Sequence, residues 1–184
     1  MKFKQYNVYT DGSYIPETKQ CSYGYIFVDN DEKIKYQYKM FAIDNTGLKS
    51  MYAEMKAIMY AVKTGSRMKV LMKIYTDCKT IINILNSKGK KKYSSKYSSF
   101  IYEFIKFMEK YKNNYLIEWV RGHSKNIYNN YIDKILKNND IKPGVLKKVD
   151  KIIIDWRSKK WKELWHLYLN CIWKHMKLIR DLEN

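Results

Sequence analysis

The sequence predicts an α/β fold: a mixed five-stranded sheet with helices on both faces, followed by a C-terminal helical extension. Three segments rich in β-branched and aromatic residues come first, and the short polar connection Asn30–Glu32 predicts a hairpin between the second and third. Segments with helical spacing then alternate with two further strand-like segments, as expected of a mixed sheet covered by helices. The expected strands are 3–10, 23–29, 33–40, 69–76 and 115–120.

The helices are predicted from apolar residues that recur at helical spacing. In the first helix, over 50–63, Ala57 and Ile58 share an apolar face. Ser50 is available as its N-cap, and Gly65 is expected to end it. Further helices are expected over 78–87, 98–112 and 126–138.

The composition changes near Pro143 and Gly144, which predicts a first domain over 1–142 and a C-terminal extension over 143–184. The extension holds four of the five tryptophans and reads as an amphipathic helix. Its apolar stripe is expected to pack on the domain or to mediate self-association. The alternative is that the extension binds nucleic acid or a replication protein.

The formal net charge of +18 predicts a polyanionic partner, because a basic protein releases counterions from phosphates when it binds them. The alternative is lysine enrichment by an AT-rich genome, which would raise the charge without a functional demand. No stretch approaches the ~20 apolar residues that span a bilayer, and the N-terminus does not resemble a signal peptide. We therefore expect no membrane association and a cytoplasmic location, in a bacterium or as a viral protein in the host cytoplasm.

Three acids stand at the ends of elements that should pack together. Asp11 is expected at the end of the first strand, Glu54 in the first turns of a helix, and Asp77 at the end of the fourth strand. Carboxylates brought so close repel one another unless a divalent cation lies between them, and hard oxygen ligands favour Mg²⁺ or Mn²⁺. Each acid alone also has a structural explanation, as a turn residue, a helix-dipole partner or an N-cap.

The residues around these acids resemble the motifs of type 1 ribonuclease H. The matching stretches are Tyr9–Ser13, Tyr52–Ala57 and Ile74–Asp77, in the family's order and on the same kinds of element. Trp119–His123 is similar to the family's last strand and its histidine loop, and the family's asparagine and last aspartate match Asn129 and Asp133. The resemblance covers about residues 3–140.

The resemblance implies an endonuclease that hydrolyses the RNA strand of RNA/DNA hybrids with two Mg²⁺ ions, leaving 5′-phosphates; Mn²⁺ is a possible substitute. It implies that Asp11 bridges both ions and that Glu54 and Asp77 hold the one nearer the leaving group. Asp133 would then hold the ion that activates water. His123 would act as a catalytic proton shuttle or assist product release.

Substrate contacts are expected from small polar groups and from lysines, because a hybrid is recognised by its 2′-hydroxyls and its shape. The chain departs from many relatives at two of these positions, where they have an asparagine in place of Ser50 and a glutamine in place of Lys79. A short Ser-rich basic loop stands where some bacterial members have a long basic protrusion. The predicted substrate-binding residues are Gly12, Ser13, Ser50, Lys79, Lys90, Lys91, Lys92 and Asn129.

Two rival functions remain open from the sequence. One is a nuclease of the same fold that acts on a DNA junction or double-stranded RNA. The other is a nucleic-acid-binding module without catalysis, which would have no reason to keep four mutually repelling carboxylates.

Overall fold

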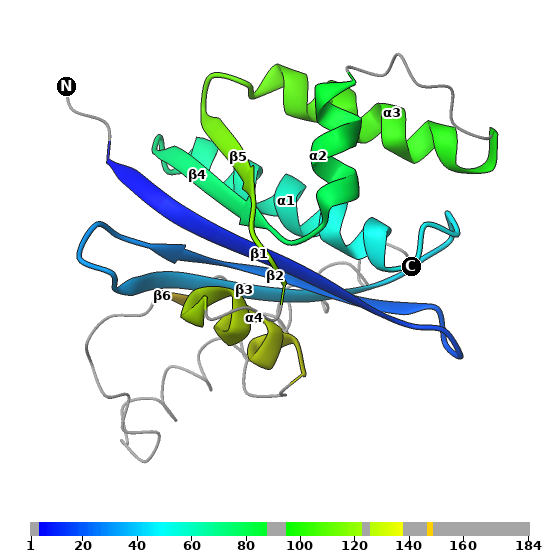
Figure 1. Cartoon of the computed structure of the whole chain (residues 1–184), viewed down its shortest axis with the longest axis horizontal. Coiled ribbons are helices and arrows are strands. Elements are labelled where there is room, and N and C mark those ends of the chain that lie inside the picture. The colour runs from blue at the N-terminus through cyan, green and yellow to red at the C-terminus, as the bar shows by residue number, and fades with distance from the viewer. Residues whose placement is uncertain (1–3, 88–94, 123–125, 138–146, 149–184) are drawn as a thin grey trace, which may run out of the picture. The chain divides into compact units, whose positions relative to one another are not determined.

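A mixed sheet is the central element of the described residues in a computed structural model, which describes residues 4–87, 95–122, 126–137 and 147–148. Its strand order is β5-β4-β1-β2-β3-β6 (Figure 1). β1, β2, β3 and β6 are antiparallel neighbours, whereas β4 and β5 run parallel to β1. The predicted mixed sheet of five strands is confirmed, with a two-residue strand added at one edge. The strands are β1 (Gln5–Ile15), β2 (Gln20–Val28), β3 (Ile34–Ile43), β4 (Leu71–Thr76), β5 (Tyr115–Trp119) and β6 (Lys147–Lys148).

Helices cover both faces of the sheet, as predicted. Figure 1 shows α1, α2 and α3 on one side and α4 on the other. Successive residues of a strand point to opposite faces. Val8 of β1 therefore belongs to the core cluster that includes Ile58 of α1, whereas the next residue, Tyr9, packs with Ile132 of α4. The helices are α1 (Ser50–Arg67), α2 (Lys79–Asn86), α3 (Ser95–Lys110) and α4 (Ile127–Lys137).

β1 is longer than the sequence predicts, and Asp11 lies within it rather than at its end. The parallel pairing with β4 stops at Tyr9 opposite Tyr75, but the antiparallel pairing with β2 continues to Ile15 opposite Gln20. Long-range pairing with β2 thus holds a segment of low strand propensity in an extended conformation. Asp11 lies just beyond the point where β4 ends its pairing with β1.

The ends of α1 also differ from the prediction. Lys49, with φ 58°, is the N-cap residue and makes no side-chain capping bond, so Ser50 is the first helical residue and not the cap. Gly65 does not end the helix but lies buried inside it. A Cβ atom at Gly65 would lie 2.2 Å from the Met72 sulfur of β4, so the glycine permits close packing of helix on sheet.

The loop from β3 to α1 is organised by Asp44, which is 3% exposed. Its Oδ1 accepts hydrogen bonds from the Thr46 amide (2.8 Å), the Thr46 hydroxyl (2.6 Å) and the Gly47 amide (3.1 Å). Its Oδ2 accepts one from the Lys49 amide at 2.7 Å. Burial alone would raise the pKa of Asp44, but these hydrogen bonds outweigh burial and lower the pKa. The ionised carboxylate therefore fixes the chain where α1 begins.

β6 pairs with Tyr36 and Gln37 at the outer edge of β3 and is a strand that the sequence does not predict. Residues 149–184 lie outside the described residues, so the predicted C-terminal helix and its partners stay predictions, as does the boundary at 142–143. Among the described helices, none combines the length and the apolar composition that a membrane span requires.

Candidate active site

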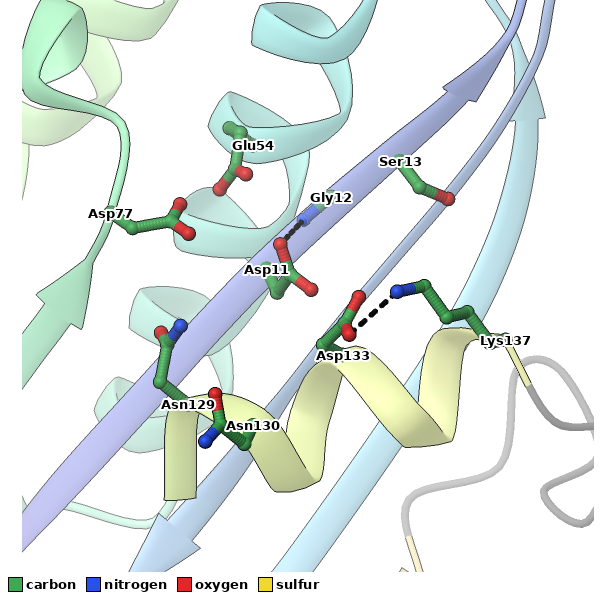
Figure 2. A pocket seen from close by; sticks show the side chains of 9 residues that line it. All are labelled: Asp11, Gly12, Ser13, Glu54, Asp77, Asn129, Asn130, Asp133 and Lys137. Carbon is green, nitrogen blue, oxygen red and sulfur yellow. Dashed lines mark hydrogen bonds and ion pairs between the residues drawn. The ribbon is translucent and has the colours of Figure 1, made fainter. Parts of the chain in front are cut away.

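Three acids from three elements meet where β4 ends beside β1. Asp11 comes from β1, Glu54 from the second turn of α1, and Asp77 directly follows β4. One carboxylate oxygen from each of them lies within 4.8 Å of those of the other two (Figure 2). The structure therefore brings together the three acids that the sequence predicts to converge. We call Asp11, Glu54 and Asp77 the three-acid group.

Gly12 allows α1 to approach β1 closely enough to place Glu54. A Cβ atom at Gly12 would lie 2.5 Å from the Ala53 carbonyl carbon and 2.5 Å from the Glu54 amide nitrogen. Real Cβ atoms do not approach backbone atoms so closely, so any other residue would push the helix away. Gly12 also donates its amide to Asp11 Oδ1 at 2.8 Å, which orients that carboxylate.

The three-acid group is electrostatically strained in the protein alone. Burial raises the pKa of Glu54 well above its ordinary value, and the charges of Asp11 and Asp77 add to the effect. Burial, together with the charge of Asp77, raises the pKa of Asp11 to about 6. Glu54 is 6% exposed, and its Oε2 is buried without a hydrogen-bond partner in the described part of the chain. A buried acceptor of this kind costs free energy until something binds it.

The end of β5 holds Asp77 in place. The Trp119 indole Nε1 donates a hydrogen bond to the Asp77 carbonyl oxygen at 3.0 Å, and the Val120 amide donates to the Thr76 carbonyl at 2.9 Å. Gly122 lies against the Asp77 carboxylate, since a Cβ atom there would be 2.6 Å from Oδ2. Hydrogen bonds therefore hold the backbone at Asp77, and Gly122 leaves room for its carboxylate. Asp77 does not cap α2, whose N-cap residue is Cys78.

Gly122→Ala should weaken divalent-cation binding without unfolding the protein. The three atoms nearest to the added methyl group would all belong to the Asp77 side chain, with Oδ2 at 2.6 Å and Cβ and Cγ at 3.3 Å, so that carboxylate would turn away from Asp11 and Glu54. We expect cation affinity to fall roughly 10- to 100-fold, as for other residues that orient a ligand, and the free energy of unfolding to change by less than about 1 kcal/mol. Calorimetric titration with Mn²⁺ measures the first and urea unfolding the second. Arg121→Lys at the exposed neighbour is the control, and equal affinities in the two variants would contradict the placement of Gly122.

Asp133 lies in the same pocket but outside the three-acid group. Its Oδ2 accepts a hydrogen bond from the Lys137 ammonium at 2.7 Å (Figure 2). This bond, with the charge of Asp133 and then that of Asp11, raises the pKa of Lys137. Asn129 is 3% exposed, and its Oδ1 has no hydrogen-bond partner among the described residues. The pocket is lined by Asp11, Gly12, Ser13, Glu54, Asp77, Asn129, Asn130, Asp133 and Lys137.

The predicted substrate-binding residues fall into three groups. Gly12, Ser13 and Asn129 line the pocket. Ser50 and Lys79 are exposed and do not line it; the Lys79 ammonium lies 5.6 Å from the centre of the Trp119 ring. The remaining residues, together with the predicted catalytic histidine, lie outside the described residues: Lys90, Lys91, Lys92 and His123.

Sequence reasoning missed two residues of the pocket, Asn130 and Lys137. Lys137 could have been found, because it lies four residues after Asp133 and such residues share a helix face. Asn130 follows a residue of the recognised pattern but carries no signal of its own. Asp44 was also missed, although aspartate before Asn-Thr-Gly is typical of a side chain that bonds to its own turn.

The residues of the pocket fit a hard divalent cation. Carboxylate oxygens converge, one of them is buried without a partner in the described part of the chain, and burial together with mutual repulsion raises the pKa of Asp11 and of Glu54. A cation would remove the repulsion and bind the unpaired Glu54 oxygen. An all-oxygen donor set suits Mg²⁺ or Mn²⁺.

Comparisons with known proteins agree with this fold. The sequence profile of the RNase H family matches residues 3–140. The foamy viral protease-reverse transcriptase, solved with dsDNA, has a TM-score of 0.58 at 19% identity over 73% of this chain and 92% of that chain. RNase H1 from the archaeon Halobacterium salinarum has a TM-score of 0.53 at 13% identity over 64% and 86%. The N-terminal RNase H domain of a Mycobacterium tuberculosis protein has 0.57 at 13% identity over 73% and 91%.

No curated protein matches the chain. At these identities the solved structures bear on the fold alone, whereas the family profile spans three quarters of the sequence. The chain belongs to the RNase H family of nucleases.

Proposed function

We propose that the protein hydrolyses the RNA strand of RNA/DNA hybrids with the help of two divalent cations. The observation that supports this proposal most is the convergence of Asp11, Glu54 and Asp77 in a pocket that also contains Asp133. Membership of the RNase H family supports a nuclease, and the net charge of +18 supports a polyanionic substrate.

The four acids would divide between the two cations. Asp11 would contact both, Glu54 and Asp77 the first, and Asp133 the second. When bound, the cations would lower the pKa of the attacking water and stabilise the charge on the leaving oxygen. The oxygen of that water would form a bond to phosphorus, the bond from phosphorus to the 3′-oxygen would break, and a proton would pass to that oxygen. The products would be a 5′-phosphate and a 3′-hydroxyl.

The acids must be ionised to act as ligands. The pKa of Asp11 is raised to about 6 and that of Glu54 is raised well above its ordinary value, so cation binding would release protons at neutral pH. His123 would shuttle a proton on the product side or assist product release.

Recognition of the hybrid would come from small polar groups that reach 2′-hydroxyls. Gly12, Ser13 and Asn129 line the pocket and would contact the RNA strand there. Ser50 and Lys79 would contact the substrate outside the pocket, and Lys90, Lys91 and Lys92 would add phosphate contacts.

A comparison of substrates tests the proposal. Uniformly labelled RNA/DNA hybrid, duplex DNA, duplex RNA and a four-way DNA junction are incubated with the protein in Mg²⁺. We expect only the hybrid to be cleaved at an appreciable rate, within its RNA strand, with 5′-phosphates on the products. Cleavage of a junction or of duplex RNA in preference would establish one rival function, and tight binding without cleavage in Mg²⁺ or Mn²⁺ would establish the other.

A further inference from the structure

Lys137 is the one basic side chain among the described residues that line the pocket. It lies one helical turn after Asp133 on α4, and its ammonium points back to that carboxylate (Figure 2). The N–O distance of 2.7 Å is that of a charge-assisted hydrogen bond. Within the described part of the chain, none of the acids of the three-acid group forms an ion pair, so Asp133 differs from them in this respect.

Resting on the function proposed above, we propose that Lys137 is a positioning residue that competes with the second divalent cation for the Asp133 carboxylate. When a carboxylate oxygen accepts a hydrogen bond from an ammonium group, one of its lone pairs is no longer available to a metal ion. The positive charge beside it also repels a dication. The three-acid group has no such competitor among the described residues. The two cations would therefore bind in order, first at the three-acid group and then, at a higher concentration, on the Asp133 side.

Competition for Asp133 and a purely structural role for the ion pair predict different effects on cation affinity. Pairs four residues apart on an exposed helix stabilise it by only a few tenths of a kcal/mol. Glu109, in the last turn of α3, forms another exposed pair with Lys112, which lies three residues further on, just beyond the helix end, and neither residue lines the pocket. A structural pair would leave cation affinity unchanged when broken, or weaken it through loss of order. If the Lys137 ammonium competes with the metal ion, its removal must instead raise the affinity of the protein for that ion.

The test compares two variants of the full chain that each remove one positive charge from α4. Lys137→Met removes the competitor, and Lys134→Met, at the exposed residue directly after Asp133, is the matched control because Lys134 does not line the pocket. Calorimetric titration with Mn²⁺ measures each binding event without substrate. We expect Lys137→Met to bind the second cation about 3- to 10-fold more tightly than Lys134→Met, since an exposed pair and one screened charge each contribute a small factor. Lys137→Arg should behave as the unchanged protein does.

A second measurement links the competition to catalysis. The Mg²⁺ concentration that gives half-maximal hybrid cleavage should fall in Lys137→Met and not in Lys134→Met. The proposed role of Lys137 is overturned if Lys137→Met binds the second cation no more tightly than Lys134→Met does. It is also overturned if neither variant binds a second cation. In that case a cation still bound at the three-acid group leaves the proposed function intact. Absence of any cation binding by the unchanged protein would overturn both.

Discussion

Asp11→Asn should lower hybrid cleavage roughly 1000-fold or more while making the metal-free protein more stable. Asp11 would contact both cations, whose stabilisation of charge in the transition state amounts to several kcal/mol, and about 4 kcal/mol corresponds to roughly three powers of ten in rate. Cleavage of labelled hybrid in Mg²⁺ measures the loss. A variant that cuts as fast as the unchanged protein would refute the assignment of the acids as cation ligands.

The gain in stability follows from the pKa of Asp11, which rises from 3.8 to about 6 on folding. The folded protein holds this proton more tightly, so the contribution of Asp11 to stability declines as pH rises from about 4 to about 6 and stays low above that range. Two pKa units correspond to at most roughly 3 kcal/mol. In EDTA, Asp11→Asn should therefore raise the melting temperature at pH 7.5 more than at pH 4.5.

A matched control for the stability measurement is Asp31→Asn in the β2–β3 connection, where the side chain is 74% exposed. It removes the same charge far from the pocket and should shift the melting temperature little at either pH. An equal gain in both variants would mean that the effect is one of net charge and not of repulsion among the acids.

Gly12→Ala should destabilise the protein by about 3 kcal/mol and abolish cleavage, because the new methyl group would overlap backbone atoms of Ala53 and Glu54 that cannot move independently. α1 would have to shift away from β1 and would take the Glu54 carboxylate with it. Urea unfolding in EDTA measures the loss of stability, and Mn²⁺ titration measures the loss of the cation site.

The neighbouring substitution Ser13→Ala is the control for Gly12→Ala. It removes a hydroxyl that lies 2.6 Å from the Ser22 hydroxyl, and it should cost only about 1 kcal/mol. A free energy of unfolding for Gly12→Ala as high as that of Ser13→Ala would show that α1 can yield at this contact. The close approach would then not be what places Glu54.

The sequence was sufficient for the elements and acids whose signals are local. Asp11 and Asp77 follow strand-like runs that become parallel neighbours, and Glu54 lies near the start of a helix with a clear apolar face, so their convergence followed from the order of elements. The resemblance to the family added Asp133, four residues after Asn129 on the last predicted helix of the domain. The convergence of Asp11, Glu54 and Asp77 could be predicted because it depends on a few adjacent residues at each position and on one packing rule.

The features that the sequence did not predict depend on partners far away along the chain. β1 continues past Gly12 because β2 pairs with it, and α1 continues past Gly65 because Met72 fills the space beside that glycine. The two residues of β6 become a strand only because the edge of β3 is open to them. The bond from Lys137 to Asp133 is an exception, since its partners are only four residues apart: the spacing places both on one helix face, but the conformation of the long lysine side chain decides whether they bond.

The hydrogen bonds of Asp44 imply that a fall in pH has opposite effects on stability at Asp44 and at Glu54, which lies only ten residues further along the chain. The pKa of Asp44 is lowered in the folded protein, so the stability that it contributes is present at neutral pH and is lost as the carboxyl group takes up a proton. Protonation of Asp11 and Glu54 meanwhile relieves their repulsion. Mild acidity should thus reduce the repulsion within the three-acid group, whereas stronger acidity should break the hydrogen bonds of Asp44 that fix the start of α1, the helix that carries Glu54.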